Sequence, residues 1–217
     1  MPHQKTDSAT QTRDATQTSA GPVYAPRYDR VVFPGELAHR LTARDKFIFA
    51  ARQTIEPINL TPAIISAGYG GYTNGDPKYG TGLGAFGERF GAAVLRQDSY
   101  RLLADGFMPI LFREDPRYYR LGEGTLAKRF FYAVGEAFVT RTDGGRTVPN
   151  YAGLLGRGIA SSLTYTYYPA PSANARVVLD TFGTSVAGDA GLNILRELTP
   201  EEVFKRLKRL HLRVTGE

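Results

Sequence analysis

FREDPRYYRLGEG, from Phe112 to Gly124, is the stretch that divides this sequence into two helical halves. Pro116 lacks a backbone N–H and disfavours helical angles in the residue before it, so a preceding helix is expected to end there. Gly122 and Gly124 permit positive φ, and a second helix is expected to begin at about Thr125. The sequence therefore predicts a corner between two helices at this position.

Side chains of the same corner can pair with one another or with their neighbours. We expect Asp115 and Arg117 to tie the corner to another helix, with Tyr118 and Tyr119 covering the junction. Charged corners of this kind are common between packed helices. They can also face a ligand, and the sequence leaves both interpretations open.

The composition indicates a single domain with a basic balance. The 217 residues are 42% hydrophobic, which is enough for a core, and the formal net charge of +6 favours acidic partners such as anionic lipid. Cysteine is absent and the three histidines are far apart in the sequence, so we expect neither a metal site nor a cofactor. The sequence contains no run of about eighteen apolar residues, so we predict no transmembrane helix. Polar residues follow Met1, so we expect no secretory signal.

Three parts of the chain differ in composition. Residues 1–29 are rich in Thr, Gln and Ser and are predicted to be a disordered polar tail. Residues 30–198 show helical periodicity interrupted by Gly and Pro, which predicts an all-α domain, a compact bundle of about five to seven helices with glycine-rich packing faces. Residues 199–217 begin with a capping box and are predicted to be a C-terminal basic amphipathic helix.

Within the central domain, cap signals mark several helix starts. These are Thr42 with Asp45, Asn150 and Asn174. Further helices are predicted over Leu60–Ala67, Gly84–Phe112 with a break near Gly106 and Pro109, and Leu126–Thr140, while Gly68–Gly82 is predicted to be a loop. Gly84, Gly87 and Gly91 share one helix face and are expected to let another helix approach closely, whereas the alternation over Leu163–Tyr168 is compatible with a short strand.

Four charged residues lie within otherwise apolar helical segments: Arg89, Glu136, Arg157 and Asp189. Burying an ion without a partner is costly, so we expect these residues to pair. Arg89 with Asp189 and Arg157 with Glu136 are the expected structural pairs. The alternative is a polar pocket between helices that binds an anionic ligand or supports acid/base chemistry.

Two groups of residues are candidate binding surfaces. The first group could line a ligand pocket and consists of Arg89, Asp115, Arg117, Tyr118, Tyr119, Arg141, Asp143 and Asp189. The second is the charged face of the terminal helix and could meet a membrane or a partner; it consists of Lys205, Arg206, Lys208 and Arg209. Gly82, Gly84 and Gly87 match GxGxxG but follow no predicted strand, so we assign them to helix packing and predict no catalytic residue.

Short motifs from Thr42 to Leu198 support one resemblance. They are DxRYY at Asp115–Tyr119 with Gly122 and Gly124 after it, GERFG at Gly87–Gly91, RTD at Arg141–Asp143, YYP at Tyr167–Pro169 and DAxxNxxxE from Asp189. This pattern resembles a family of uncharacterised, largely helical bacterial proteins, many of which carry an export signal. The resemblance implies a location at the cell envelope, although this sequence departs from the family in lacking that signal. It implies no particular reaction.

Two functions remain open from the sequence. The first is a non-enzymatic envelope or membrane-surface protein that binds a partner or a lipid surface, as the small-residue helix faces, the 13 tyrosines and the basic last helix favour. The second is an enzyme or ligand carrier with an Arg/Asp pocket between helices. Nucleic-acid binding through the terminal helix is a third and less favoured possibility, because the tail contains few basic residues.

Overall fold

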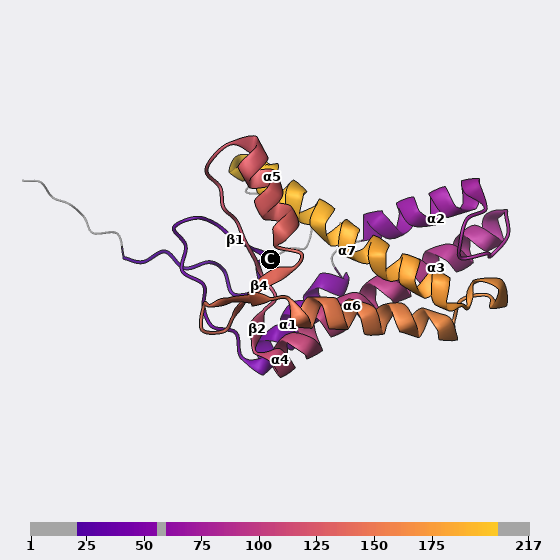
Figure 1. The fold of residues 1–217 in the computed structure, drawn as a ribbon, viewed down its shortest axis with the longest axis horizontal. Helices are drawn as coiled ribbons and strands as arrows, with labels where there is room; N and C mark the ends of the chain where they lie inside the picture. The colour runs from indigo at the N-terminus through magenta and orange to yellow at the C-terminus, as the bar shows by residue number, and fades with distance from the viewer. Residues whose placement is uncertain (1–20, 56–59, 204–217) are drawn as a thin grey trace, which may run out of the picture.

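The structure is a computed structural model and describes residues 21–55 and 60–203. The described chain is mostly helical, as the sequence predicts, and it also contains two small sheets (Figure 1). The α-helices are α1 (Ala43–Ile55), α2 (Thr61–Thr73), α3 (Leu83–Tyr100), α4 (Met108–Phe112), α5 (Leu126–Gly135), α6 (Tyr151–Leu163) and α7 (Ala175–Leu198). A π-helix, η2 (Arg101–Phe107), continues α3 into α4, and two short 3₁₀ helices, η3 (Thr164–Thr166) and η4 (Ala170–Ser172), precede α7.

The helices form one bundle that is longer than it is wide (Figure 1). One end holds the strands with α1, α4 and α5, and the other end holds α2 and α3 with the far parts of α6 and α7. Helix α7 spans both ends and packs against α5 and α6. None of the helices in the described ranges is both long and apolar enough to cross a membrane.

Side-chain caps start the helices where the sequence predicts them. The amide of Thr42 donates to the Asp45 carboxylate at 3.0 Å, and the Asp45 amide donates back to the Thr42 hydroxyl at 3.2 Å. Asn150 and Asn174 cap α6 and α7 in the same way, and Thr125 caps α5. The four predicted helix starts are therefore confirmed.

The corner contains strands that the sequence did not reveal. After α4 ends, Arg113 adopts a left-handed conformation with φ 56°, and β2 (Glu114–Asp115) and β3 (Tyr118–Tyr119) follow on either side of Pro116. Strand β3 pairs in parallel with β1 (Val31–Val32). Strands β4 (Val139–Thr142) and β5 (Thr147–Pro149) form a hairpin whose first strand pairs antiparallel with β2.

Three predicted boundaries differ from the structure. The helix predicted over Leu126–Thr140 ends at Gly135, because the residues after it turn back to pair with the corner. The strand considered at Leu163–Tyr168 is instead the last residue of α6 and the turn η3. Helix α2 continues to Thr73, through glycines that we assigned to a loop.

The two terminal predictions fall largely outside the described residues. Of the predicted tail, residues 21–29 are described, and there the Ala25 amide donates to the carbonyl of Leu37 at 2.9 Å. The described chain thus extends into the segment that we assigned to the tail. Of the predicted terminal helix, residues 201–203 are helical, and Lys205, Arg206, Lys208 and Arg209 lie outside the described residues.

Small residues bring α1, η2 and α6 into close contact. A Cβ added to Gly156 of α6 would lie 2.6 Å from the backbone of Ala104 in η2, and one added to Gly106 would lie 3.0 Å from the Cβ of Ala50 in α1. At the predicted face of Gly84, Gly87 and Gly91, by contrast, an added Cβ would meet no described atom within 4 Å. Within the described residues, close packing thus depends on the contacts of η2 rather than on the first turns of α3.

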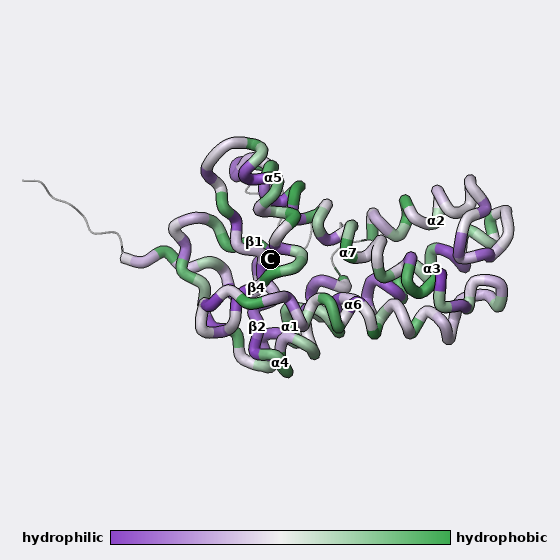
Figure 2. The backbone as a smooth tube through the Cα atoms, in the orientation of Figure 1, coloured by the Kyte–Doolittle hydropathy of each residue, from purple (hydrophilic) through white to green (hydrophobic). Residues whose placement is uncertain are grey.

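The interior is rich in polar side chains, and many apolar ones lie outside. The largest fully buried side chains include Lys46, Glu197, Thr164 and Ser161. In contrast, Leu83 is 91% exposed, and hydrophobic stretches are distributed over both ends of the molecule (Figure 2). Buried apolar residues such as Phe49 are thus accompanied by more buried polar groups, and by more exposed apolar ones, than a typical water-exposed domain shows.

The contact between α6 and η2 predicts opposite effects of two alanine substitutions on one helix. Gly156→Ala should lower the free energy of unfolding by about 1–3 kcal/mol, because backbone atoms cannot move aside for the new Cβ. Gly158→Ala is the matched control and should raise it by up to about 1 kcal/mol, because its Cβ would lie 4.0 Å from Phe182 and alanine favours a helix. Urea unfolding of both variants measures this difference. Equal effects would contradict the proposed close contact.

Candidate functional site

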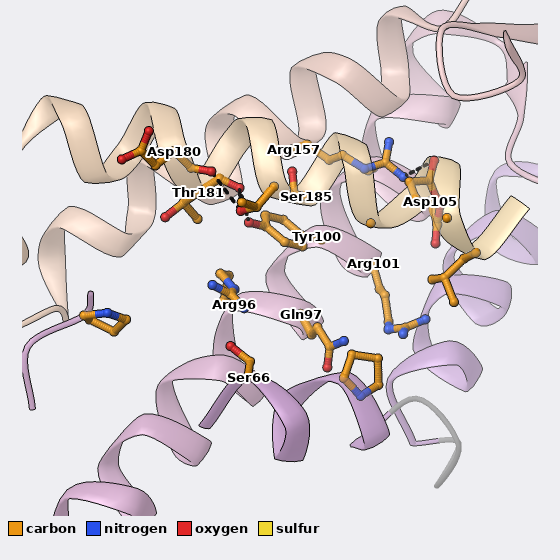
Figure 3. A pocket seen from close by; sticks show the side chains of 18 of the residues that line it. Ser66, Arg96, Gln97, Tyr100, Arg101, Asp105, Arg157, Asp180, Thr181 and Ser185 are labelled. Carbon is orange, nitrogen blue, oxygen red and sulfur yellow. Dashed lines mark hydrogen bonds and ion pairs between the residues drawn. The ribbon is translucent and has the colours of Figure 1, made fainter. Parts of the chain in front are cut away.

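A groove between α3 and α7 is the first candidate site of the described residues. Its volume is about 630 Å³, which is within the range of small-molecule sites. Helix α2 closes one side, and η2 and α6 form the charged end. Figure 3 shows Arg96, Gln97 and Tyr100 on the side of α3, facing Thr181 and Ser185 of α7.

The π-helix η2 supplies two of the charged residues in the groove. Arg101 and Asp105 lie four positions apart in η2, and i→i+5 hydrogen bonding places residues at this spacing on nearly the same side. Ala104 and Gly106 on either side of Asp105 pack against α6 and α1. Insertions of this kind are frequent at functional sites because they redirect side chains without ending a helix.

Two ion pairs cross the charged end of the groove. Arg157 of α6 lies 2.7 Å from the carboxylate of Asp189 in α7, and Arg30, from the segment before β1, pairs with Asp105. Asp105 and Arg157 are buried, at 7% and 8% exposure. Arg157 therefore meets the carboxylate of α7, and Arg30 meets that of η2.

A further arginine of α7 is also directed into this end. Arg196 donates to the side-chain oxygen of Asn193 at 2.8 Å. Burial lowers the pKa of Arg196 to about 10, and the positive charges of Arg30 and Arg101 act in the same direction. For Asp189, burial would raise the pKa, but the charge of Arg157 and those of Arg30 and Arg196 outweigh it and lower the pKa. This end of the groove thus favours negative charge.

Aromatic hydroxyls line the middle of the groove. The guanidinium of Arg96 donates to the hydroxyl of Tyr168 at 3.4 Å. The hydroxyl of Tyr100 donates to the carbonyl of Thr181 at 3.5 Å (Figure 3). Burial raises the pKa of Tyr168. The Tyr168 hydroxyl therefore remains protonated at neutral pH.

Four of the predicted ligand residues gather around a second cavity, beside the corner. Asp115, Tyr119, Arg141 and Asp143 line this cavity of about 450 Å³. The Tyr119 hydroxyl donates to Asp115 at 2.8 Å, and the Arg141 guanidinium lies 4.1 Å from the centre of the Tyr119 ring. Asp115, however, is already engaged by two nitrogens of Arg117, at 2.9 and 2.6 Å. The cavity is thus lined by groups that satisfy one another.

The remaining predicted residues lie apart from that cavity. Tyr118 is buried and donates its hydroxyl to Glu197 at 2.8 Å. Asp189 lines the groove between α3 and α7, and it also lines a small cavity together with Asp115, Arg117 and Tyr118. Arg89 donates to the carbonyls of Gly75 and Gly80, at 3.1 and 3.0 Å, and so holds the loop after α2. The eight predicted residues therefore do not share one cavity.

Both predicted ion pairs are wrong. Arg157 pairs with Asp189, whereas Arg89 binds backbone carbonyls. Glu136 is the cap residue that ends α5. Its pKa is raised, because the effect of burial exceeds the opposing effects of Tyr132 and Arg141. The partners could not be chosen from the sequence, because helical periodicity shows which face of a helix a charge lies on but not which helix lies opposite.

The corner is tied to α7 by Tyr118, as expected for a residue that covers the junction, and by residues that were not predicted. Arg117 donates to the carbonyl of His39 at 2.6 Å, in the segment before α1, so this hydrogen bond of the Asp115–Arg117 pair reaches a loop and not a helix. Instead, the Glu197 carboxylate of α7 accepts from the amides of Leu121 and Gly122, at 3.0 and 2.9 Å. Arg129 of α5 donates to the same carboxylate at 2.9 Å.

Sequence reasoning missed the most buried carboxylate, although a signal for it was present. Asp189, Asn193 and Glu197 are the charged and amide positions of DAxxNxxxE, and their four-residue spacing places them on one face of α7. All three are directed inward, to Arg157, Arg196 and Arg129. A polar face on a helix with many outward apolar residues would have indicated a polar interior.

The described residues contain no group of three or more His, Asp or Glu side chains that could hold a metal ion. Comparisons with protein-family models, curated proteins and solved structures gave no match to this chain. The resemblance of the corner to a bacterial family therefore stays a prediction.

The ligands of Glu197 predict how stability depends on pH. The amides, Tyr118 and Arg129 lower the pKa of Glu197 below its ordinary value of 4.5, although burial alone would raise it. Because the folded state prefers the ionised form, this stabilisation is complete above the ordinary pKa and is lost as the pH falls through the lowered one. Glu114 and Glu136, whose pKa burial raises, act in the opposite direction.

We expect Glu197→Gln to lower the free energy of unfolding on the order of 3 kcal/mol at pH 7. The loss should become smaller as the pH falls from 7 toward 3, because a growing fraction of the wild-type carboxylate is then protonated. Glu123→Gln, at an exposed carboxylate of the same corner, is the control and should have little effect at either pH. Urea unfolding at both values measures the difference. An equal loss for Glu197→Gln at pH 7 and pH 3 would show that its charge does not stabilise the fold.

Proposed function

We propose that the protein is a non-enzymatic membrane-surface protein of the cell envelope, whose helices contact lipid through outward apolar side chains. The observation that carries this proposal is the inverted polarity of α6. Tyr151, Leu155, Ile159 and Leu163 follow one another at four-residue spacing and are 42–51% exposed. The envelope location is supported by the resemblance of the corner motifs.

The opposite face of α6 is buried and consists of alanines and glycines with one arginine and one serine. Arg157 and Ser161 lie there, with 8% and 0% exposure, and Gly156 packs on η2. A helix of a domain surrounded by water normally has its apolar face inside and its charges outside. The exposed apolar face of α6 is unfavourable in water, and it becomes favourable when an apolar surface of lipid or protein covers it.

Helix α2 also has apolar side chains exposed on its surface. Ile64, Ile65, Tyr69 and Tyr72 are 52–91% exposed. Burying a side chain of this size in an apolar medium contributes roughly 1.5–3 kcal/mol. Tyrosine is suited to the boundary between lipid and water, because its ring is apolar and its hydroxyl is polar.

The overall charge favours an anionic lipid surface. Each Lys or Arg near such a surface contributes about 1 kcal/mol, and the chain has a formal net charge of +6. The predicted basic face of Lys205, Arg206, Lys208 and Arg209 would add to this attraction. It remains a prediction, since those residues lie outside the described ranges.

A ligand carrier is the second candidate function, and a separate observation favours it. The groove between α3 and α7 encloses about 630 Å³ and has a positive end. Neither candidate requires a reaction.

Vesicle binding tests the role of the α6 stripe. Wild-type protein should co-sediment with vesicles of phosphatidylcholine and phosphatidylglycerol, and more weakly with phosphatidylcholine alone. The double variant Leu155→Gln/Ile159→Gln should bind about tenfold more weakly, since roughly 1.4 kcal/mol of apolar contact is lost. Thr147→Gln, at an exposed position of β5 away from α6, is the control and should bind as the wild type does.

Two results would contradict the lipid proposal. One is a wild-type protein that sediments with neither vesicle type. The other is a wild-type protein that forms a dimer in light scattering while the double variant is a monomer, because this would assign the stripe to a second copy of the chain.

A further inference from the structure

We propose that the groove between α3 and α7 binds one anionic amphiphile, with its carboxylate or phosphate at the arginine-rich end and its alkyl chain along α7. This inference goes beyond contact with a lipid surface, because the ligand would lie inside the molecule. It also names the ligand class that a carrier would take.

The charge of the groove is unevenly distributed. At one end lie four arginines and two aspartates, which are Arg30, Arg101, Arg157, Arg196, Asp105 and Asp189. Within the groove lining, two carboxylates neutralise two of these four guanidinium charges. Outside the lining, Asp98 acts on Arg101, and Glu114 and Glu136 lie in a small cavity behind this end. The lowered pKa of Arg196, to which Arg30 and Arg101 contribute, agrees with such an excess.

The opposite end of the groove has a different character. Asp180 lies there, but its side chain is 69% exposed and pairs with Arg176 on the outer side of α7. Asp76 accepts a hydrogen bond from Ser172 at 2.7 Å. The carboxylates of this end are therefore directed to solvent or to a neighbouring loop, and an anionic headgroup would be attracted to the arginine end.

The length of the groove suits an alkyl chain. Its α7 wall runs from Val177 to Arg196, a separation of about 28 Å at a rise of 1.5 Å per residue. One acyl chain in a bilayer leaflet extends about 15 Å, half of the hydrocarbon thickness. The groove is therefore long enough to hold a headgroup and a chain end to end.

The floor of the groove leaves room for such a chain. Between Val177 and Asp189, the α7 wall consists of short side chains, including Thr181, Ser185 and Gly188. A Cβ added at Gly188 would meet no described atom within 4 Å. Across the groove, Tyr100 and Pro62 add a ring surface and an apolar edge. Carbon atoms of small side chains and rings line much of the middle of the groove, where the Arg96 guanidinium is bound to Tyr168, while the other four guanidinium groups lie at its end.

Four monomeric probes, each titrated below its micelle-forming concentration in a calorimeter, test the proposal. Dodecanoate and dodecyl phosphate carry a chain and an anion, inorganic phosphate carries the anion alone, and dodecyl maltoside carries the chain with an uncharged head. We expect both anionic amphiphiles to bind at one site per chain. Inorganic phosphate and dodecyl maltoside should each bind at least tenfold more weakly. If dodecanoate binds and dodecyl phosphate does not, the headgroup is a carboxylate, which keeps the proposal and narrows the ligand.

Two pairs of variants locate the site. Gly188→Leu should reduce affinity at least tenfold by filling the groove, whereas Gly183→Leu, on the same helix and outside the groove lining, should not. Arg196→Gln should reduce affinity for the anionic probes, whereas Arg176→Gln, whose side chain is 90% exposed, removes the same charge and should not. Thermal unfolding by circular dichroism confirms that each variant is folded before it is titrated.

Several outcomes would overturn the proposal. They are absence of binding by the anionic amphiphiles, equal binding of dodecyl maltoside or of inorganic phosphate, and unchanged affinity in folded Gly188→Leu. Because the probes are monomeric and no vesicle is present, failure here leaves the vesicle test unaffected. Failure of vesicle binding likewise leaves the groove unaffected.

Discussion

The carboxylate of Glu197 is the constraint on which the arrangement of the helices depends. It is fully buried and joins the end of α7 to the corner amides, to Tyr118 and to Arg129 of α5. A buried charge is tolerated only when several partners satisfy it, so the end of α7 cannot separate from the corner without a large cost. With that end held, Asp189 lies two turns earlier on the same face and is directed to Arg157. The contacts of Glu197, which lie outside the groove, therefore determine which face of α7 supplies the charged wall of the groove.

Ions in the interior determine where apolar residues can lie. Helix α6 has its buried arginine and its closest glycine contact on one face, so its stripe of Leu155, Ile159 and Leu163 must lie on the other. The same reasoning applies at α1, where Lys46 is buried and lies 2.7 Å from Asp143. Polar interiors of this kind specify which helices are neighbours, because each ion accepts few partners. They also leave apolar side chains on the surface, where lipid or another protein can contact them.

Much of the fold could be predicted from local signals, and the site could not. Caps such as Thr42 and Asn174 act within one turn of the chain, so their effect is visible in the sequence. Strands β2 and β4 are short and pair across 26 or more residues, as Glu114 does with Thr142, and nothing local marks them. The ion pairs failed for the same reason, since the partner of Arg157 depends on how α6 and α7 pack. The π-helix is likewise determined by packing rather than by residue type.

The π-helix connects the rigid part of the molecule to the groove. Gly156 and Ala50 contact it at distances that leave no room for larger side chains, so η2 is held from both sides. Arg101 and Asp105 therefore project from a fixed element, while α2 reaches the groove mainly through its packing on α3. The charged end of the groove, on η2, is fixed, whereas the wall formed by α2 is held by fewer contacts. Such a site can orient an anionic group and still admit chains of different length. The positive end and the apolar outer faces thus have a common origin, because both result from burying ions along α6, α7 and η2.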